Sequence, residues 1–211
     1  MVGYKVKEIY YTLQGEGAQT GRPAVFCRFT GCNLWSGREE DRASAICKFC
    51  DTNFWGTDGV QGGKYEDAKA LAAKINSLWE GADDKKYVVF TGGEPLLQLD
   101  DNLVSAMHET GFEVAVETNG TIALPEKLDW ACVSPKAGTE VVVWKADEIK
   151  IVFPQDGIDP IHFEKGEFTH FFLQPMDNEA KDQNTAACVA FCLKFPKWKL
   201  SLQTHKLIGL P

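Results

Sequence analysis

Short runs rich in β-branched and aromatic residues alternate along the chain with longer stretches in which apolar residues recur at helical spacing. The clearest helical stretch covers residues 66–80, where apolar positions fall three or four residues apart. The same periodicity predicts helices over residues 96–110 and 179–195. Helices therefore occupy only a modest share of the chain.

The short apolar runs predict eight strands, which are bounded by Gly, Pro and small polar residues. They cover residues 4–14, 24–30, 87–90, 112–117, 129–133, 148–153, 169–173 and 199–204. Strands that alternate with helices form parallel βαβ units. A complete (β/α) barrel needs about 250 residues, and this chain has 211. We therefore expect an α/β fold over residues 1–211, a single domain built as an incomplete (β/α) barrel with a mostly parallel sheet and reduced helix content.

Polar motifs or motifs that contain Gly and Pro follow almost every predicted strand. The C-terminal ends of parallel strands meet at one edge of the sheet and carry the site in α/β folds. Residues 15–23 read as a loop, and residues 33–46, which are polar and mixed in charge, read as a solvated insertion. We expect the functional site where the motifs after the strands converge.

The composition is that of an ordinary globular protein, with 44% hydrophobic and 25% charged residues. Disorder, collagen and coiled coil are therefore excluded for the whole chain. The net charge of −8 argues against binding to nucleic-acid backbones, which requires clustered Lys and Arg. No apolar run approaches a membrane span, and the N-terminus lacks the apolar core of a secretory signal. We therefore expect a cytoplasmic protein with neither a membrane nor a nucleic acid as partner.

Seven cysteines in a reducing compartment point to metal binding or catalysis before disulfides. Cys47 and Cys50 have the C-x2-C spacing that lets two thiolates reach one metal centre, and a loop of fourteen residues can bring Cys32 beside them. A structural zinc closes its shell with four ligands, whereas an iron–sulfur cluster held by three cysteines leaves one iron open. Apolar surroundings favour core packing for the other cysteines, which are Cys27, Cys132, Cys188 and Cys192.

Two other interpretations of the C-x2-C pair have less support. A thioredoxin-like redox pair would start a helix directly after a strand, but this pair follows the polar insertion. A zinc site needs a fourth ligand, and the histidines are all remote in sequence from the cysteines. They are His108, His162, His170 and His205.

Phe49 directly precedes the last of the three cysteines, and Gly-Gly-Glu-Pro at residues 92–95 follows a predicted strand. Together these features resemble the radical S-adenosylmethionine (SAM) enzymes. Their usual spacing is C-x3-C-x2-C, and this chain departs from it with fourteen residues between the first two cysteines. That departure, with Leu-Gln-Gly-Glu-Gly at 13–17 and Cys-Asp-Thr at 50–52, closely resembles the 7-carboxy-7-deazaguanine synthase family of queuosine and deazapurine biosynthesis. The resemblance covers residues 13–205.

Two glycine motifs have other interpretations. Residues 92–95 are not a P-loop, because no Gly-Lys-Ser/Thr follows. One interpretation is that they form a tight turn between strand and helix and have no other role. The other interpretation is that their glycines let the backbone approach the SAM amino group closely. The three cysteines favour this second interpretation. Residues 15–17 do not match a dinucleotide-binding motif, because a strand follows them instead of a helix.

The resemblance implies that Cys32, Cys47 and Cys50 hold a 4Fe-4S cluster, which soft thiolates suit. The open iron would bind SAM, and one-electron reduction would cleave it to methionine and a 5′-deoxyadenosyl radical. The resemblance also implies SAM contacts from strand-end segments that, taken alone, would be read as turns. These residues are Phe49, Cys50, Asp51, Gly93, Glu94, Glu117, Asn119, Ser134, Pro135, Lys136, Gln174, Pro175, Met176 and Asp177.

The substrate implied by the resemblance is 6-carboxy-5,6,7,8-tetrahydropterin. Its expected contacts are Leu13, Gln14, Gly15, Glu16, Arg28, Thr91, His205 and Pro211, with Glu16, Arg28 and His205 as catalytic residues. A carboxylate such as Glu16 accepts paired N–H donors of a pterin edge, and Arg28 offers a planar fork to the substrate carboxylate. We also expect the carboxylate at the chain end to reach this pocket. If the three cysteines were absent, the preferred interpretation would be that Glu16 is an exposed loop residue and that Arg28 is a strand residue in a surface ion pair.

Thr52 resembles a magnesium ligand of the same family. Mg2+ prefers oxygen ligands and keeps several waters, so one hydroxyl with substrate oxygens is a sufficient site. The alternative is that Thr52 caps a helix N-terminus. The residues alone leave both interpretations open, and the resemblance favours magnesium.

The resemblance predicts a radical SAM lyase that removes a hydrogen atom from C6 of the pterin, contracts the ring and releases ammonia. The product is 7-carboxy-7-deazaguanine, and SAM is regenerated. A flavodoxin or ferredoxin is expected as reductant, and a homodimer as the assembly. Two alternatives remain: another radical SAM enzyme, such as an activase that makes a glycyl radical on a partner, and a non-enzymatic zinc-binding module. Gln14, Glu16 and Arg28 favour a small polar substrate over the first, and the missing fourth ligand disfavours the second.

Overall fold

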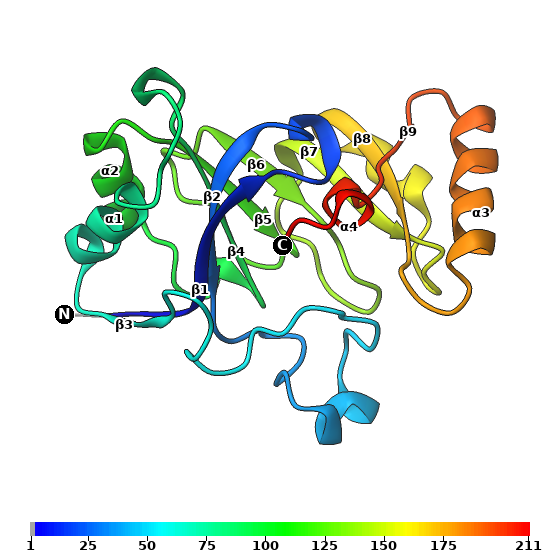
Figure 1. Ribbon diagram of the computed structural model, residues 1–211. Coiled ribbons are helices and arrows are strands. Elements are labelled where there is room, and N and C mark those ends of the chain that lie inside the picture. Colours follow the sequence, from blue (N-terminus) through cyan, green and yellow to red (C-terminus); the bar gives the residue numbers. More distant parts are fainter. Residues whose placement is uncertain (1–2) are drawn as a thin grey trace.

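The computed structural model describes residues 3–211, whose strands form one nine-stranded sheet (Figure 1). In sheet order these are β3 (Gly63–Tyr65), β1 (Tyr4–Leu13), β2 (Pro23–Phe29), β4 (Tyr87–Gly92), β5 (Glu113–Thr118), β6 (Trp130–Val133), β7 (Lys145–Phe153), β8 (Glu167–Pro175) and β9 (Lys199–Leu200). β1 is antiparallel to both its neighbours, and the pairs from β2 to β9 are parallel. This open, mostly parallel sheet confirms the expected incomplete (β/α) barrel.

Helices cover the outer face of the sheet at both ends (Figure 1). α1 (Ala68–Asn76) packs near β1 and α2 (Asp101–Glu109) against β5, while α3 (Lys181–Lys194) packs against β7 and β8. α4 (Thr204–Ile208) is a short C-terminal helix. The 3-10 turns are η1 (Gly17–Gln19), η2 (Glu39–Ser44), η3 (Asp83–Lys85), η4 (Pro95–Leu97) and η5 (Pro160–Lys165). None of the helices within residues 3–211 has the length and apolar character to cross a bilayer.

Two apolar cores lie between the sheet and its helices. The first lies under α1 and α2 and contains the stacked rings of Phe29 and Phe90, whose centroids are 5.6 Å apart. The second lies under α3 and contains Ile151 and Trp198. On the inner face of the sheet, a smaller apolar cluster around Tyr87 packs near the start of the strands. The inner face nearer the strand ends is left to polar side chains.

A β-bulge in β1 determines which side chains of this strand face the interior. The pairing with β2 shifts between Val6 and Glu8, which leaves Lys7 as an extra residue. The alternation of side chains therefore changes parity: Val6 and Ile9 both pack in the outer core, while Glu8 and Tyr10 line the inner cavity. With regular alternation, Glu8 would lie on the same face as Val6.

Two predicted elements are wrong in part. The predicted helix 96–110 begins only at Asp101, because the Asp100 carboxylate accepts a hydrogen bond from the Leu103 N–H and caps α2 there. The residues before it form the separate turn η4. The predicted strand 199–204 ends at Leu200, and α4 begins at Thr204.

Other predicted elements keep their type but differ at their ends. β7 and β8 each begin earlier than predicted, and α1 is shorter than the predicted 66–80. β3 was not predicted, because three residues are too few to show an alternating pattern. Cys27, Cys132 and Cys188 are buried, as predicted, and Cys192 is half-buried against the second core.

Phe90→Ala should lower the free energy of unfolding by about 3–5 kcal/mol, because it removes a fully buried ring and its stacking contact with Phe29. Urea denaturation measures this change. Leu193→Ala is the control, since Leu193 is 79% exposed, and it should change stability by no more than about 0.5 kcal/mol. Equal losses in the two variants would contradict this account of the core.

Candidate functional site

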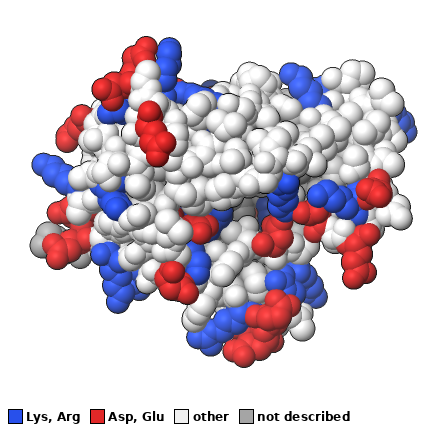
Figure 2. Space-filling view, viewed as in Figure 1, with Lys and Arg blue, Asp and Glu red and all other residues white. Residues whose placement is uncertain are grey.

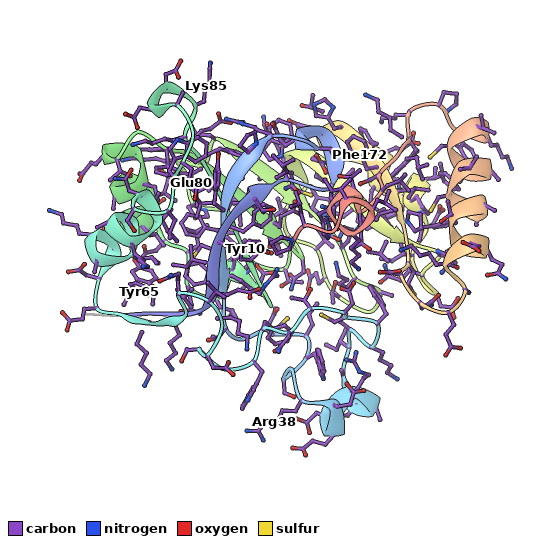
Figure 3. The ribbon with its side chains drawn as sticks, viewed as in Figure 1. Tyr10, Arg38, Tyr65, Glu80, Lys85 and Phe172 are labelled. Atoms are coloured by element: carbon purple, nitrogen blue, oxygen red, sulfur yellow. The ribbon has the colours of Figure 1, made fainter. Side chains whose placement is uncertain are left out.

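A cavity of about 570 Å3 opens where strands β4 to β8 end, a size within the range of small-molecule sites. Tyr10 on β1, which is labelled in Figure 3, is one of the residues that line this cavity. The wall also includes residues 13–16, residues 49–54 and parts of the C-terminal segment after Leu202. Segments that are far apart in sequence thus meet at one mouth.

The predicted site residues converge at this cavity with two exceptions. The lining residues predicted for substrate or metal are Leu13, Gln14, Gly15, Glu16, Arg28, Thr91, His205, Pro211, Cys32, Cys47, Cys50 and Thr52. Those predicted for SAM are Phe49, Cys50, Asp51, Gly93, Glu117, Asn119, Ser134, Lys136, Gln174, Pro175, Met176 and Asp177. Glu94 and Pro135 do not line the cavity, and both are buried behind its wall.

Cys32, Cys47 and Cys50 line one corner of the cavity. A hydrogen bond from the Cys47 thiol lowers the pKa of Cys50 to about 6, and burial raises the pKa of Cys32. Within residues 3–211, no three His, Cys, Asp or Glu side chains are grouped tightly enough to hold a single metal ion. A four-iron cluster makes a different demand, because each thiolate binds its own iron. Three soft sulfur ligands at one corner fit such a cluster.

The polar insertion that separates the first two cysteines is anchored at its base. Trp35 is buried and packs edge-on against Phe54, with ring centroids 5.5 Å apart. Arg42 donates hydrogen bonds to the carbonyl oxygens of Lys48 and Cys50 at 2.9 and 3.1 Å. The outer part, η2, is exposed, and Arg38 beside it projects away from the sheet (Figure 3). The anchored base brings the two ends of the insertion to the same corner.

Glu94 is a buried clamp behind the cavity. Its carboxylate accepts hydrogen bonds from the Leu96 N–H, the Thr118 hydroxyl and the Asn119 N–H at 3.0, 2.7 and 2.8 Å. These bonds tie the turn after β4 to the end of β5. Because the side chain has no exposed surface, all three bonds are shielded from water.

Gly93 lets two strand ends come close together. A Cβ atom at this position would overlap the carbonyl oxygen of Gly31, which follows β2. The Glu94 N–H donates a hydrogen bond to the same carbonyl at 2.9 Å. The Gly-Gly-Glu sequence thus joins the end of β4 to the segment that leads into Cys32.

Arg28 lies on the wall formed by β1 and β2. Its guanidinium donates to the Glu8 carboxylate at 2.8 Å and to the Tyr10 hydroxyl at 3.1 Å. Burial would lower the pKa of Arg28, but these partners raise it. The Tyr10 and Phe26 rings stack 5.8 Å apart on the same wall. This wall therefore combines a fixed positive charge with a flat aromatic surface.

A buried ionic cluster occupies the interior nearer β7. Lys150 pairs with Glu16 at 2.7 Å and with Glu117 at 2.9 Å. Burial would raise the pKa of Glu16, but the Lys150 ammonium outweighs burial and lowers it to about 2. Both glutamates line the cavity, and the Glu16 carboxylate faces it in its charged form.

The C-terminal segment closes one side of the cavity. The Gly15 carbonyl accepts hydrogen bonds from the Thr204 N–H and hydroxyl, each at 2.9 Å. Lys206 pairs with Asp51 at 2.9 Å and with Asp177 at 2.5 Å. These contacts join the segment to three separate parts of the wall. Figure 1 shows α4 and the C-terminus in front of the sheet.

Sequence reasoning missed Glu8, Tyr10 and Lys150, which also line the cavity. A usable signal existed for Lys150, because it is a charge between Ile149 and Ile151 in a run that reads as a buried strand. No sequence signal marks Glu8 and Tyr10, because their inward orientation follows from the bulge in β1.

Comparison with known proteins gives matches over the full length of the chain, although no family model matches it. The 7-carboxy-7-deazaguanine synthase of Caulobacter vibrioides is 58% identical over 208 residues and covers 99% of both chains. That of Bordetella pertussis is 58% identical over 210 residues and covers 100% of both. The crystal structure of QueE from Escherichia coli is similar with a TM-score of 0.70 and 27% identity, over 96% of this chain and 95% of that one.

Glu94→Gln should lower the free energy of unfolding by about 1–3 kcal/mol, because the new amide NH2 cannot accept one of the three buried hydrogen bonds. Urea denaturation at pH 7 measures the loss. Glu126→Gln makes the same chemical change at an exposed position and should alter stability by no more than about 0.5 kcal/mol. A Glu94→Gln protein as stable as this control would show that the clamp is not needed.

Proposed function

The chain belongs to the 7-carboxy-7-deazaguanine synthase family, and from this premise we propose that its single domain is a radical SAM lyase. In this proposal it converts 6-carboxy-5,6,7,8-tetrahydropterin to 7-carboxy-7-deazaguanine with loss of ammonia, and it uses SAM catalytically. The observation that supports this most is that the three cysteines share one cavity with Glu16 and Arg28. The proposed cluster ligands and the proposed substrate contacts therefore line the same space.

The cofactor half of the cavity is the corner with Cys32, Cys47 and Cys50, which would hold a 4Fe-4S cluster. Cluster and SAM, when bound, supply the one-electron and hydrogen-atom chemistry that protein side chains lack. Around this corner, the Lys136 ammonium donates a hydrogen bond to the Ser134 hydroxyl at 2.8 Å, and the segment 174–177 lines the same cavity. We assign these groups, with Gly93 and Asn119, to SAM binding.

The substrate half is the wall with Glu16 and Arg28. The charged Glu16 carboxylate can accept the adjacent N–H donors of the pterin, and Arg28 can pair with the substrate carboxylate. Burial lowers the pKa of His205, so its neutral ring offers one donor and one acceptor to the substrate. The flat stack of Tyr10 and Phe26 lies near enough to Arg28 to limit how the pterin ring is placed.

We assign three further partners on the family relationship. Thr52 lines the cavity beside Cys50, and its hydroxyl would bind Mg2+ together with substrate oxygens and water. A flavodoxin or ferredoxin would deliver the electron. The assembly would be a homodimer.

Protein purified without oxygen should be brown and hold about four irons per chain with matching sulfide. Cys50→Ala should lose most of this iron, because each of the three thiolates binds a different iron. Cys192→Ala is the matched control and should keep it, since Cys192 lies on α3 outside the cavity. A colourless protein that holds one zinc after attempted cluster reconstitution would refute the radical SAM assignment and favour a zinc-binding module.

Reduced holoenzyme with SAM and Mg2+ should convert 6-carboxy-5,6,7,8-tetrahydropterin to 7-carboxy-7-deazaguanine. Arg28→Gln should raise KM for this substrate by about 10- to 100-fold, since it removes a charge-assisted hydrogen bond. Tetrahydropterin without the carboxyl group serves as the comparison ligand, and its affinity should fall much less in the variant. Equal losses for both ligands would show that Arg28 does not recognise the carboxylate.

A further inference from the structure

Lys150 is a buried lysine in the wall of the cavity. It lies on β7 between Ile149 and Ile151, whose side chains pack in the core under α3. The Lys150 side chain points the other way, into the half-barrel, where it lines the cavity and is only 4% exposed. Burying an ammonium group is costly unless anions surround it.

The two carboxylates that surround Lys150 belong to different halves of the site. Glu16 follows β1 in the substrate half, and Glu117 lies near the end of β5, among residues assigned to SAM. The Lys150 ammonium lies 2.7 Å from one carboxylate and 2.9 Å from the other. One positive charge therefore spans both halves.

Gln14 closes the arrangement into a ring. Its amide NH2 donates to Glu117 at 3.2 Å, and its amide oxygen accepts a hydrogen bond from the Glu16 N–H at 3.1 Å. Moving either carboxylate would disturb the ammonium and this bridge together. Hydrogen bonds and ion pairs thus join Gln14, Glu16, Lys150 and Glu117 into a closed ring that connects the two halves of the site.

Building on the proposed function, we propose that Lys150 is a positioning residue that couples pterin binding to SAM binding. It fixes the carboxylates of Glu16 and Glu117 at the same time, and it acts through them. Stability alone does not account for such a group, because replacing buried ion pairs by apolar side chains is often neutral or stabilising.

Other titratable groups face the same ammonium. Glu148 on β7 accepts hydrogen bonds from the Ala18 N–H at 2.9 Å and the Cys132 thiol on β6 at 3.4 Å, and burial raises its pKa. His205 on α4 and Lys136 after β6 also face this cluster. Burial lowers the pKa of each, and the charge of Lys150 lowers both further. Burial opposes the charge of Lys150, but the surrounding acidic groups raise its pKa well above its usual value. Lys150 therefore stays charged over the working pH range.

The pH dependence of pterin binding follows from this arrangement. In the wild type the pKa of Glu16 is about 2, so Glu16 stays ionised between pH 6 and 8.5. Titration of Glu16 should therefore not change the pterin affinity over this range. Without the ammonium, the largest influence left on the Glu16 pKa is burial, which raises it. Its carboxylate then gains a proton as the pH falls, and it loses the ability to accept two N–H donors.

The test measures the Kd of 6-carboxy-5,6,7,8-tetrahydropterin on anaerobic holoenzyme by calorimetry, with and without SAM, from pH 6 to 8.5. Lys150→Met should weaken binding by about tenfold or more at pH 7.5 and increasingly at lower pH. It should also abolish the effect of SAM on pterin affinity. Lys150→Arg should restore the flat pH profile, because arginine stays charged and its fork can reach two carboxylates. Lys145→Met, at an exposed lysine on the same strand, is the matched control and should match the wild type.

A Lys150→Met protein with wild-type pterin affinity at every pH, or one weakened by the same factor throughout, would overturn the proposal. If that variant does not fold, Glu117→Gln decides: pterin affinity that still depends on SAM as in the wild type would refute the coupling. Wild-type holoenzyme that neither binds nor converts the pterin would instead refute the proposed function. Wild-type turnover with an unchanged Lys150→Met profile would refute this inference alone.

Discussion

Charge balance inside the half-barrel is the constraint around which the site is built. Glu16, Glu117 and Glu148 all reach the interior from different segments, and Lys150 is the cation at their centre. Carboxylates that are buried this close together would otherwise repel one another and take up protons. The same ammonium lowers the pKa of Glu16 and pairs with Glu117 at the cavity wall. One side chain therefore links the charge of the buried acids to the shape of the cavity wall.

The rest of the architecture serves to bring distant strand ends to that interior. Glu94 ties β4 to β5, Gly93 lets the turn after β4 approach the segment after β2, and the bulge in β1 turns Glu8 and Tyr10 inward. The C-terminal segment then joins three parts of the rim. Each device is local, but each fixes the relation between two segments that are far apart in sequence. Precise placement of this kind is what radical chemistry requires of a protein whose cofactors supply the reaction itself.

The surface is less specialised than the interior. On the face of residues 3–211 seen in Figure 2, basic and acidic side chains are interspersed, so this face presents no extended basic field. That agrees with a net charge of −8 and with a small-molecule substrate. The chain remains 58% identical to curated relatives over its full length, and the fold persists at 27% identity to the crystal structure from Escherichia coli. The fold therefore tolerates extensive change in sequence.

The sequence by itself determined the fold class, the type of most elements and the motifs of the site. Apolar periodicity and strand-end motifs are local properties, and for that reason Cys32, Glu16 and Arg28 could be singled out from the residues and a family resemblance. Only the tertiary structure decided that Glu94 lies behind the wall, that Glu8 and Tyr10 face inward, and that the last strand ends at Leu200 with α4 beginning at Thr204. These outcomes depend on a bulge, a cap and hydrogen bonds between segments distant in sequence. Such long-range contacts have no local pattern, because each exists only once the strands have been brought together.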